Sequence, residues 1–296
     1  MSGRVLLQSM RGPFLVLTPV CVLLGVGTVV ANKAPVDWSL LILCLFGALL
    51  AHVSVNALNE YADFRSGLDL ATVRTPFSGG SGALPQHPEM ARAVLALGVV
   101  TLVGVILVGL YFLQQHGLAL LPLGLAGLLL MVSYTGWVNR HPFICLIAPG
   151  LGFGVLMVVG TQYVLQGQYS PLSLLAAVVP FFLVNNLLLL NQYPDIEADR
   201  DAGRRHFPIT YGTATSTVVY GFFVLLTIAT IVAGVLSGYF PRLSLVALLP
   251  MSLAFYVMRG AIRHGAAIGD YPRYLGANVA VVLLTTLLLG VSLVLG

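Results

Sequence analysis

The sequence predicts an all-α integral membrane bundle, and three observations support this fold class. Only 8% of the 296 residues are charged, 58% are hydrophobic, and long apolar runs follow one another along the whole chain. A soluble domain carries roughly 25% charged residues, whereas a helix that crosses a bilayer needs about 20 mostly apolar ones. Lipid is therefore the expected solvent for most of this chain.

Nine apolar runs are long enough to cross a membrane. The first continues past Val30 without a cleavage-like site, so we expect a transmembrane helix there and not a removable signal peptide. We expect a single transmembrane domain over residues 1–296. The predicted helices are residues 13–31, 38–60, 91–113, 117–139, 142–165, 170–192, 214–238, 241–259 and 274–296.

The positive charges predict the orientation, because cytoplasmic loops of membrane proteins collect Lys and Arg. With a cytoplasmic N-terminus, only Lys33 and Arg242 fall outside. The net charge of +4 is then a consequence of topology, and nucleic-acid binding is not expected. We expect a multi-pass protein of the cell (inner) membrane. The twelve residues placed inside are Arg4, Arg11, Arg65, Arg74, Arg92, Arg140, Arg200, Arg204, Arg205, Arg259, Arg263 and Arg273.

Seven of the ten acidic residues gather in two short stretches, each at the end of an apolar run. The stretches NEYADFRSGLD, residues 59–69, and NQYPDIEADRD, residues 191–201, align with one constant offset of 132 residues. The seven acids are Glu60, Asp63, Asp69, Asp195, Glu197, Asp199 and Asp201.

This offset predicts an internal parallel repeat, helices 1–4 and 5–8, because four predicted helices separate the stretches. The halves are residues 13–139 and 142–263, and the final helix follows at 274–296. An even number of helices puts both acidic stretches on the cytoplasmic side, where they can face each other across a central cavity.

The acidic stretches predict a metal site. On a helix, Asn59 and Asp63 share one face, and the same spacing relates Asn191 to Asp195 and Asp195 to Asp199. Carboxylates near lipid are costly unless a cation neutralises them. Oxygen ligands favour Mg²⁺, which waters and substrate phosphates usually complete. The pattern therefore indicates a metal-bridged phosphate or diphosphate.

Two alternatives remain open for these acids. They are either solvated loop charges that pair with nearby arginines, or the ion-coupling groups of a proton- or cation-coupled transporter. Transporter acids usually lie near the bilayer midplane, whereas these are predicted at one surface.

Together the two motifs resemble those of the UbiA superfamily of intramembrane aromatic prenyltransferases, and most closely its menaquinone (1,4-dihydroxy-2-naphthoate) branch. The resemblance runs through nearly the whole chain. It rests on NEYADFRSGLD and on NQYPDIEADRDAGRR, residues 191–205. It implies Mg²⁺-dependent transfer of a prenyl group from an isoprenyl diphosphate to an aromatic acceptor, such as a quinone precursor, with release of diphosphate.

The resemblance assigns roles to residues of both motifs. Asn59 and Asn191 support the site, and four aspartates hold the metal, with two Mg²⁺ ions expected. Arg140 stands near the position where the family has a Lys after Tyr-Thr-Gly. The predicted metal ligands are Asp63, Asp69, Asp195 and Asp199.

Arginines near the motifs are candidates to bind the diphosphate, because cleavage of the allylic C–O bond builds negative charge on it. Some of them are expected to be positive-inside anchors instead. Tyr61, Tyr134 and Tyr193 are candidates for lining the cavity and stabilising the allylic cation, and Tyr134 is the one predicted to be catalytic. Each of the three is equally typical of an interfacial belt. The candidates for the diphosphate are Arg74, Arg140, Arg204 and Arg205.

Several features have more than one interpretation. The SGGSG stretch, residues 78–82, is either a flexible lid or a phosphate-cradling loop. His52 either touches the acceptor or bonds a neighbouring helix. No role is assigned to the remaining polar candidates or to an oligomeric state. These candidates are Glu60, Glu197, Asp201, His141 and His206.

Overall fold

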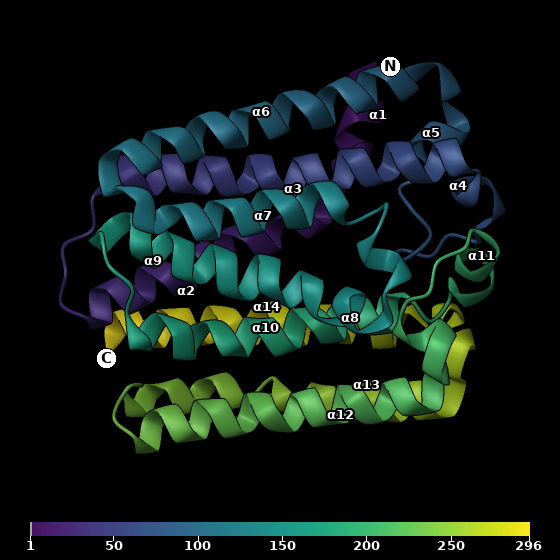
Figure 1. The fold of residues 1–296 in the computed structure, drawn as a ribbon. Coiled ribbons are helices and arrows are strands. Elements are labelled where there is room, and N and C mark those ends of the chain that lie inside the picture. The colour runs from purple at the N-terminus through teal and green to yellow at the C-terminus, as the bar shows by residue number, and fades with distance from the viewer. Residues whose placement is uncertain (1) are drawn as a thin grey trace.

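The computed structural model describes residues 2–296, and its elements are helices joined by short loops (Figure 1). Within this part of the chain, eight helical segments are long and apolar enough to cross a membrane. An all-α membrane bundle is therefore confirmed. The eight are Gly12–Ala31, Trp38–Ser66, Pro88–His116, Pro142–Gln166, Pro171–Asn191, Phe207–Leu236, Arg242–Asp270 and Pro272–Leu295.

The predicted span at 117–139 forms a shorter apolar helix, Leu118–Ser133. At 1.5 Å per residue it is about 24 Å long, less than the roughly 30 Å of hydrocarbon in a bilayer. The chain leaves the helix at Tyr134 and makes a turn before the 3-10 segment Val138–Arg140. Whether this helix is a ninth span stays a prediction.

The labels of Figure 1 follow the chain, and several membrane segments are composites of shorter helices. The elements used below are α2 (Leu17–Ala31), α3 (Trp38–Ser66), α4 (Leu68–Ala71), α6 (Ala91–His116), α7 (Leu121–Ser133), α8 (Pro142–Gly150), η5 (Leu151–Met157), α9 (Val158–Gln166), α10 (Pro171–Asn191), α11 (Ile196–Asp201), α12 (Phe207–Leu236), η6 (Arg242–Leu248), α13 (Met251–His264) and α14 (Pro272–Leu295).

Sequence signals explain where several helices begin and bend. Asp37 caps α3, because its carboxylate accepts hydrogen bonds from the N–H groups of Ser39 and Leu40. Ser170 caps α10 in the same way ahead of a proline. Pro149 lies inside α8, just before the chain widens into the π-helix η5.

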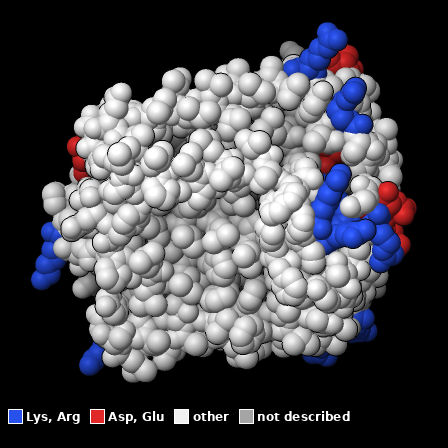
Figure 2. All heavy atoms as spheres, in the orientation of Figure 1, with Lys and Arg blue, Asp and Glu red and all other residues white. Residues whose placement is uncertain are grey.

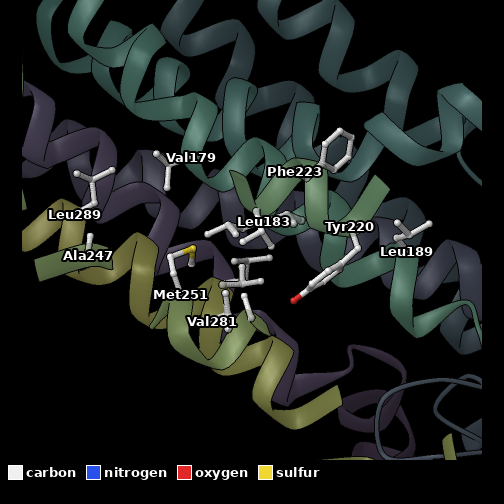
Figure 3. Close-up of a cluster of buried hydrophobic side chains, with 14 of the residues drawn as sticks. Val179, Leu183, Leu189, Tyr220, Phe223, Ala247, Met251, Val281 and Leu289 are labelled. Carbon is white, nitrogen blue, oxygen red and sulfur yellow. The ribbon is translucent and has the colours of Figure 1, made fainter. Parts of the chain in front are cut away.

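The helices of the second half pack tightly around one apolar core (Figure 3). Leu183 of α10, Tyr220 of α12 and Met251 of α13 are at most 2% exposed. Leu289 of α14 is fully buried beside them. The cavity described below extends from this core toward α3, α6 and α7.

Charged side chains gather at one end of the bundle (Figure 2). Lys and Arg cover the edge at which α4 and α11 lie in Figure 1, and most of the visible acids accompany them. Both acidic motifs lie at this one end of the bundle, where Arg204 pairs with residues of both. The rest of the visible surface is almost uncharged, as expected of a surface in contact with lipid.

Candidate active site

A cavity of about 600 Å³ runs through the bundle from the acidic end toward the opposite end. Its walls are mostly apolar side chains of α3, α6, α7, η5 and α10. Polar groups concentrate at one end, where five charged residues from both motifs reach the same space. These residues are Asp63, Asp69, Asp195, Asp199 and Arg204.

The first motif begins on α3, where helical spacing brings Asn59 and Asp63 together as predicted. The Asn59 amide donates a hydrogen bond of 2.8 Å to Asp63 Oδ2 and accepts one of 3.0 Å from the Thr135 hydroxyl. Asn59 therefore fixes one carboxylate oxygen of Asp63 and ties α3 to the turn that follows α7.

Asp69 reaches the cavity because the chain reverses at Gly67. This residue has φ 82°, in the left-handed region that glycine adopts without strain. The turn starts the short helix α4 and buries Asp69, whose Oδ2 has no hydrogen-bond partner within residues 2–296. Burial, together with the nearby charges of Glu60 and Asp63, raises the pKa of the Asp69 carboxyl to about 7.

The second motif differs from the predicted single helix. Helix α10 ends at Asn191, and the chain turns before α11 starts, so Asn191 and Asp195 do not share a helical face. Pro194 explains the break, because a proline disfavours helical geometry in the residue before it. Burial and the charge of Asp199 raise the pKa of Asp195 to about 6.

Arg204 joins the two motifs. Its guanidinium pairs with Asp63 of the first motif and, at 2.9 Å, with Asp199 of the second. His206 Nε2 lies 2.8 Å from the other oxygen of Asp199. Burial alone would lower the pKa of Arg204, but the Asp63 and Asp199 carboxylates on either side outweigh this and raise it. Residues 141 positions apart thus form one charged cluster at the cavity end.

The loop at 75–82 covers this cluster in an ordered way. The N–H of Gly79 donates a hydrogen bond of 3.0 Å to Asp195 Oδ2. Ser81 donates its N–H, at 3.1 Å, and its hydroxyl to the buried Glu60. A Cβ placed on Gly80 would lie 2.6 Å from Asp69 Oδ1. The loop therefore contacts carboxylates of both motifs, and two of its N–H groups are already paired with them.

The predicted arginines divide into two groups. Arg204 lines the cavity, while Arg74, Arg140 and Arg205 are exposed and do not. Arg74 instead donates a hydrogen bond to the Ser81 carbonyl. Their contact with a diphosphate stays a prediction.

Arg11 was not predicted as a site residue, although it lines the cavity and lies 3.8 Å from Glu60. It precedes the first span and belongs to no motif. Arg11 carries only one signal in the sequence, its basic charge on the predicted cytoplasmic side, and eleven other arginines share that property.

The tyrosine and histidine candidates differ in whether they line the cavity. Tyr134 lines the cavity, whereas Tyr193 is buried behind it and donates its hydroxyl to the Thr213 carbonyl. His52 lies 2.8 Å from the Thr18 hydroxyl of the neighbouring helix α2 and also lines the cavity, and its contact with an acceptor stays a prediction. His141 lies at the surface end, 2.9 Å from the Trp137 carbonyl.

The residues present fit Mg²⁺ with a phosphate ligand, but they do not form a complete protein cage. Within residues 2–296, no three His, Cys, Asp or Glu side chains converge closely enough to hold a metal ion. Mg²⁺ usually takes only one or two carboxylates, with waters and substrate phosphates. Asp69 Oδ2, Asp195 Oδ1 and Asn191 Oδ1 are buried, unpartnered oxygens in the described chain, and all three residues line the cavity.

A membrane bundle with a charged cluster at one end of a long apolar cavity defines a class of protein that handles an amphipathic substrate inside the bilayer. Comparison with known proteins gives the class a name. The chain belongs to the UbiA prenyltransferase family, whose model matches residues 18–268. It is therefore a membrane enzyme that transfers a prenyl group from an isoprenyl diphosphate.

Individual relatives agree with this family. A 1,4-dihydroxy-2-naphthoate octaprenyltransferase of Bacillus subtilis is 31% identical over 71% of this chain and 67% of its own length. A UbiA homolog of Aeropyrum pernix K1 has the same fold, with TM-score 0.70, 17% identity, and coverage of 92% of this chain and 95% of its own. A UbiA homolog of Archaeoglobus fulgidus, bound to GPP and Mg²⁺, has TM-score 0.61 at 13% identity, with coverage of 99% and 100%.

Proposed function

We propose that this protein catalyses Mg²⁺-dependent transfer of a prenyl group from an isoprenyl diphosphate to an aromatic acceptor of the 1,4-dihydroxy-2-naphthoate type, with release of diphosphate. The observation that carries the proposal is the convergence of both acidic motifs on one cavity end, where Arg204 links Asp63 to Asp199. The naphthoate acceptor is supported by the Bacillus subtilis relative.

The residues for the donor head group combine the free oxygens of Asp69, Asp195 and Asn191 with two aspartates of the motifs whose oxygens are paired with protein groups in this structure. Asp63 and Asp69 would hold one Mg²⁺, and Asp195 and Asp199 a second, with Asn191 contributing from the end of α10. When bound, Mg²⁺ supplies positive charge that stabilises the leaving diphosphate. The Archaeoglobus fulgidus homolog, whose structure contains Mg²⁺ and GPP, supports this assignment.

Side chains of the protein stabilise the charge, exclude water and contact the acceptor. Arg204 is held between two carboxylates, so its guanidinium is fixed in place before substrate binds. A preorganised cation of this kind stabilises a transition state with developing negative charge by roughly 3–4 kcal/mol. The apolar walls exclude water from the allylic carbon and accommodate the tail. Tyr134 and His52 line the same cavity and are positioned to contact the acceptor ring.

The proposal includes the membrane arrangement. The helix Leu118–Ser133 would be a ninth span, the two motifs would be copies in a parallel repeat, and the charged end would face the cytoplasm. The positive-inside distribution of the arginines supports this orientation. The transporter alternative loses its support, because the chain belongs to a prenyltransferase family.

The test uses purified protein in nanodiscs with labelled geranylgeranyl or farnesyl diphosphate, Mg²⁺ or EDTA, and a panel of acceptors. We expect a prenylated product with 1,4-dihydroxy-2-naphthoate, little with 4-hydroxybenzoate, and none with EDTA. Activity in EDTA would contradict the metal assignment, and preference for another acceptor would contradict the naphthoate assignment. Transport of substrate into sealed vesicles without diphosphate release would support the transporter.

A further inference from the structure

A groove lies between α12 and α13 on the outside of the bundle, where these two helices form an outer pair (Figure 1). Its volume is about 600 Å³, and none of its lining residues lines the central cavity. Two of the lining residues, Ala254 and Ala261, are buried, whereas Val218, Phe222 and Ile262 are 72%, 55% and 70% exposed. We call this feature the α12–α13 groove. Its apolar and partly exposed lining indicates an apolar occupant.

Each helix of the outer pair is fixed to a different inner helix. The Asn186 amide of α10 donates a hydrogen bond of 3.0 Å to the Tyr220 carbonyl of α12. A Cβ on Gly260 of α13 would lie 2.4 Å from the Tyr274 ring of α14, so these two helices are in close contact. Between α12 and α13 themselves, the alanines and glycines that line the groove leave its space unfilled.

The length of the groove matches one leaflet of a bilayer. On α12 its lining runs from Thr213 to Leu225. These residues are twelve positions apart, which corresponds to about 18 Å of helix. Half the hydrocarbon thickness of a bilayer is about 15 Å, whereas a spanning helix of a partner protein needs roughly 30 Å. The groove therefore fits the acyl chain of a lipid better than a transmembrane helix.

Two arginines continue the edge of the groove toward the charged end of the bundle. Phe255, which lines the groove, is followed on α13 by Arg259 and Arg263 at successive four-residue spacings, so the three share one side of the helix. Both arginines are exposed, and among residues 2–296 neither pairs with a carboxylate. The sequence has no acidic residue between Asp201 and Asp270. The positive charge beside the groove is therefore uncompensated by the protein.

The groove also touches the residues that hold the second acidic motif. Thr213 and Thr217 line it from α12. The Tyr193 hydroxyl donates to the Thr213 carbonyl at 3.0 Å and lies 2.9 Å from the Thr217 hydroxyl. Tyr193 stands two residues before Asp195. A molecule in the groove would thus pack against the partners of Tyr193.

We propose that the α12–α13 groove binds one phospholipid with an anionic head group, its acyl chain between the two helices and its phosphate at Arg259 and Arg263. Charge complementarity selects this occupant, because basic residues beside a groove between membrane helices typically bind acidic head groups. A second copy of the chain fits less well, since a two-fold dimer through this face would place the arginines of both copies at the same depth. The inference goes beyond prenyl transfer and does not depend on it.

The test is native mass spectrometry of delipidated protein in detergent, titrated with dioleoyl phosphatidylglycerol or with dioleoyl phosphatidylcholine. The charge variant is Arg259→Gln with Arg263→Gln. Its matched control is Arg65→Gln with Arg92→Gln, which removes two exposed arginines on α3 and α6. Ala214→Trp fills the groove, and Thr215→Trp is its control, because both residues are exposed but only Ala214 lines the groove. Melting temperatures show which variants are folded, and the arginine variants test the proposal even if Ala214→Trp does not fold.

We expect wild type to bind the first phosphatidylglycerol about tenfold more tightly than phosphatidylcholine. The charge variant should bind the two lipids within about twofold of each other, while its control keeps the wild-type preference. Ala214→Trp should weaken the binding of both lipids, and Thr215→Trp should not. Equal binding of the two lipids by wild type, or equal losses in a variant and its control, would overturn the proposal. A protein dimer that Ala214→Trp dissociates would overturn it too, and would assign the groove to a second copy of the chain.

Discussion

Arg204 is the residue whose loss should reveal most about this site. Replacing it with Met keeps an unbranched side chain about as long as the aliphatic part of Arg but removes the cation between Asp63 and Asp199. The Arg204 side chain is 18% exposed and its two partners at most 7%. Removing one partner of a buried ion pair costs roughly 3–5 kcal/mol. The partial exposure of Arg204 lowers the expected loss to about 2–3 kcal/mol.

The assay is thermal unfolding in detergent together with the rate of prenyl transfer. We expect the melting temperature of Arg204→Met to fall by roughly 5–10 °C. We expect kcat/KM to fall by about 10²–10³, because a fixed cation at the developing charge is lost. Added Mg²⁺ should recover part of the stability, since it neutralises the same carboxylates.

Arg205→Met is the matched control. Arg205 is the next residue, is exposed, and does not line the cavity. Its backbone N–H bond to the Asn139 carbonyl does not depend on the side chain. A surface change of this kind alters stability by about 0.5 kcal/mol or less. Similar falls in melting temperature for Arg204→Met and Arg205→Met would refute the reasoning that Arg204 links the two motifs. The comparison uses stability, because contact of Arg205 with a diphosphate stays a prediction.

Three further predictions follow from the carboxylates and the loop that covers them. Gly80→Ala should reduce Mg²⁺-dependent activity at least about tenfold, because the added Cβ would lie 2.6 Å from Asp69 Oδ1. Gly136→Ala is the control and should leave activity unchanged, because its Cβ would meet nothing within 4 Å. Glu60→Gln should weaken the anchoring of the loop and speed its cleavage in limited proteolysis; unchanged cleavage would contradict this. Without Mg²⁺, the melting temperature should fall as pH rises from about 4 to about 7. Folding raises the pKa of Asp69 to about 7 and that of Asp195 to about 6, so in this range the folded state binds more protons at these groups than the unfolded state does. Mg²⁺ at pH 7.5 should restore the lost stability, and a melting temperature that rises with pH in EDTA would contradict the prediction.

Much of the fold follows from composition, because lipid imposes a simple rule on every spanning helix. Eight of the nine predicted apolar runs form helices long enough to cross a membrane within residues 2–296. The run at 117–139 shows where the rule weakens. Hydropathy continues past Ser133, but the turn at Tyr134 is a local backbone event that an apolar window does not register.

The acidic residues were found from the sequence because both motifs repeat the same polar pattern. The detailed geometry of these residues was not predicted from the sequence, because it depends on tertiary packing. Asn191 and Asp195 were predicted to lie on one face of a helix, yet helix α10 ends at Asn191. The partners of Asp195 and Glu60 are Gly79 and Ser81, in a loop that the sequence predicted as a flexible lid or a phosphate cradle and not as a partner of carboxylates.

The basic residues were the least predictable part of the site. Every arginine predicted to lie on the cytoplasmic side carries the same positive-inside signal, so charge alone does not separate an anchor from a ligand contact. Arg204 and Arg205 are neighbours in sequence, but only Arg204 reaches the cavity. Arg11 reaches it from outside every motif, because the chain before α2 folds back against Glu60.

The central claim is that the two acidic motifs form one site, and a double-mutant cycle of Asp69→Asn and Asp195→Asn tests it most directly. The kcat/KM of prenyl transfer is measured for wild type, both single variants and the double variant. We predict that each single variant loses about 10²-fold or more and that the double variant loses little beyond the worse single, because groups that act as a unit are not additive. Fully additive losses, or normal turnover in either single variant, would contradict a shared site.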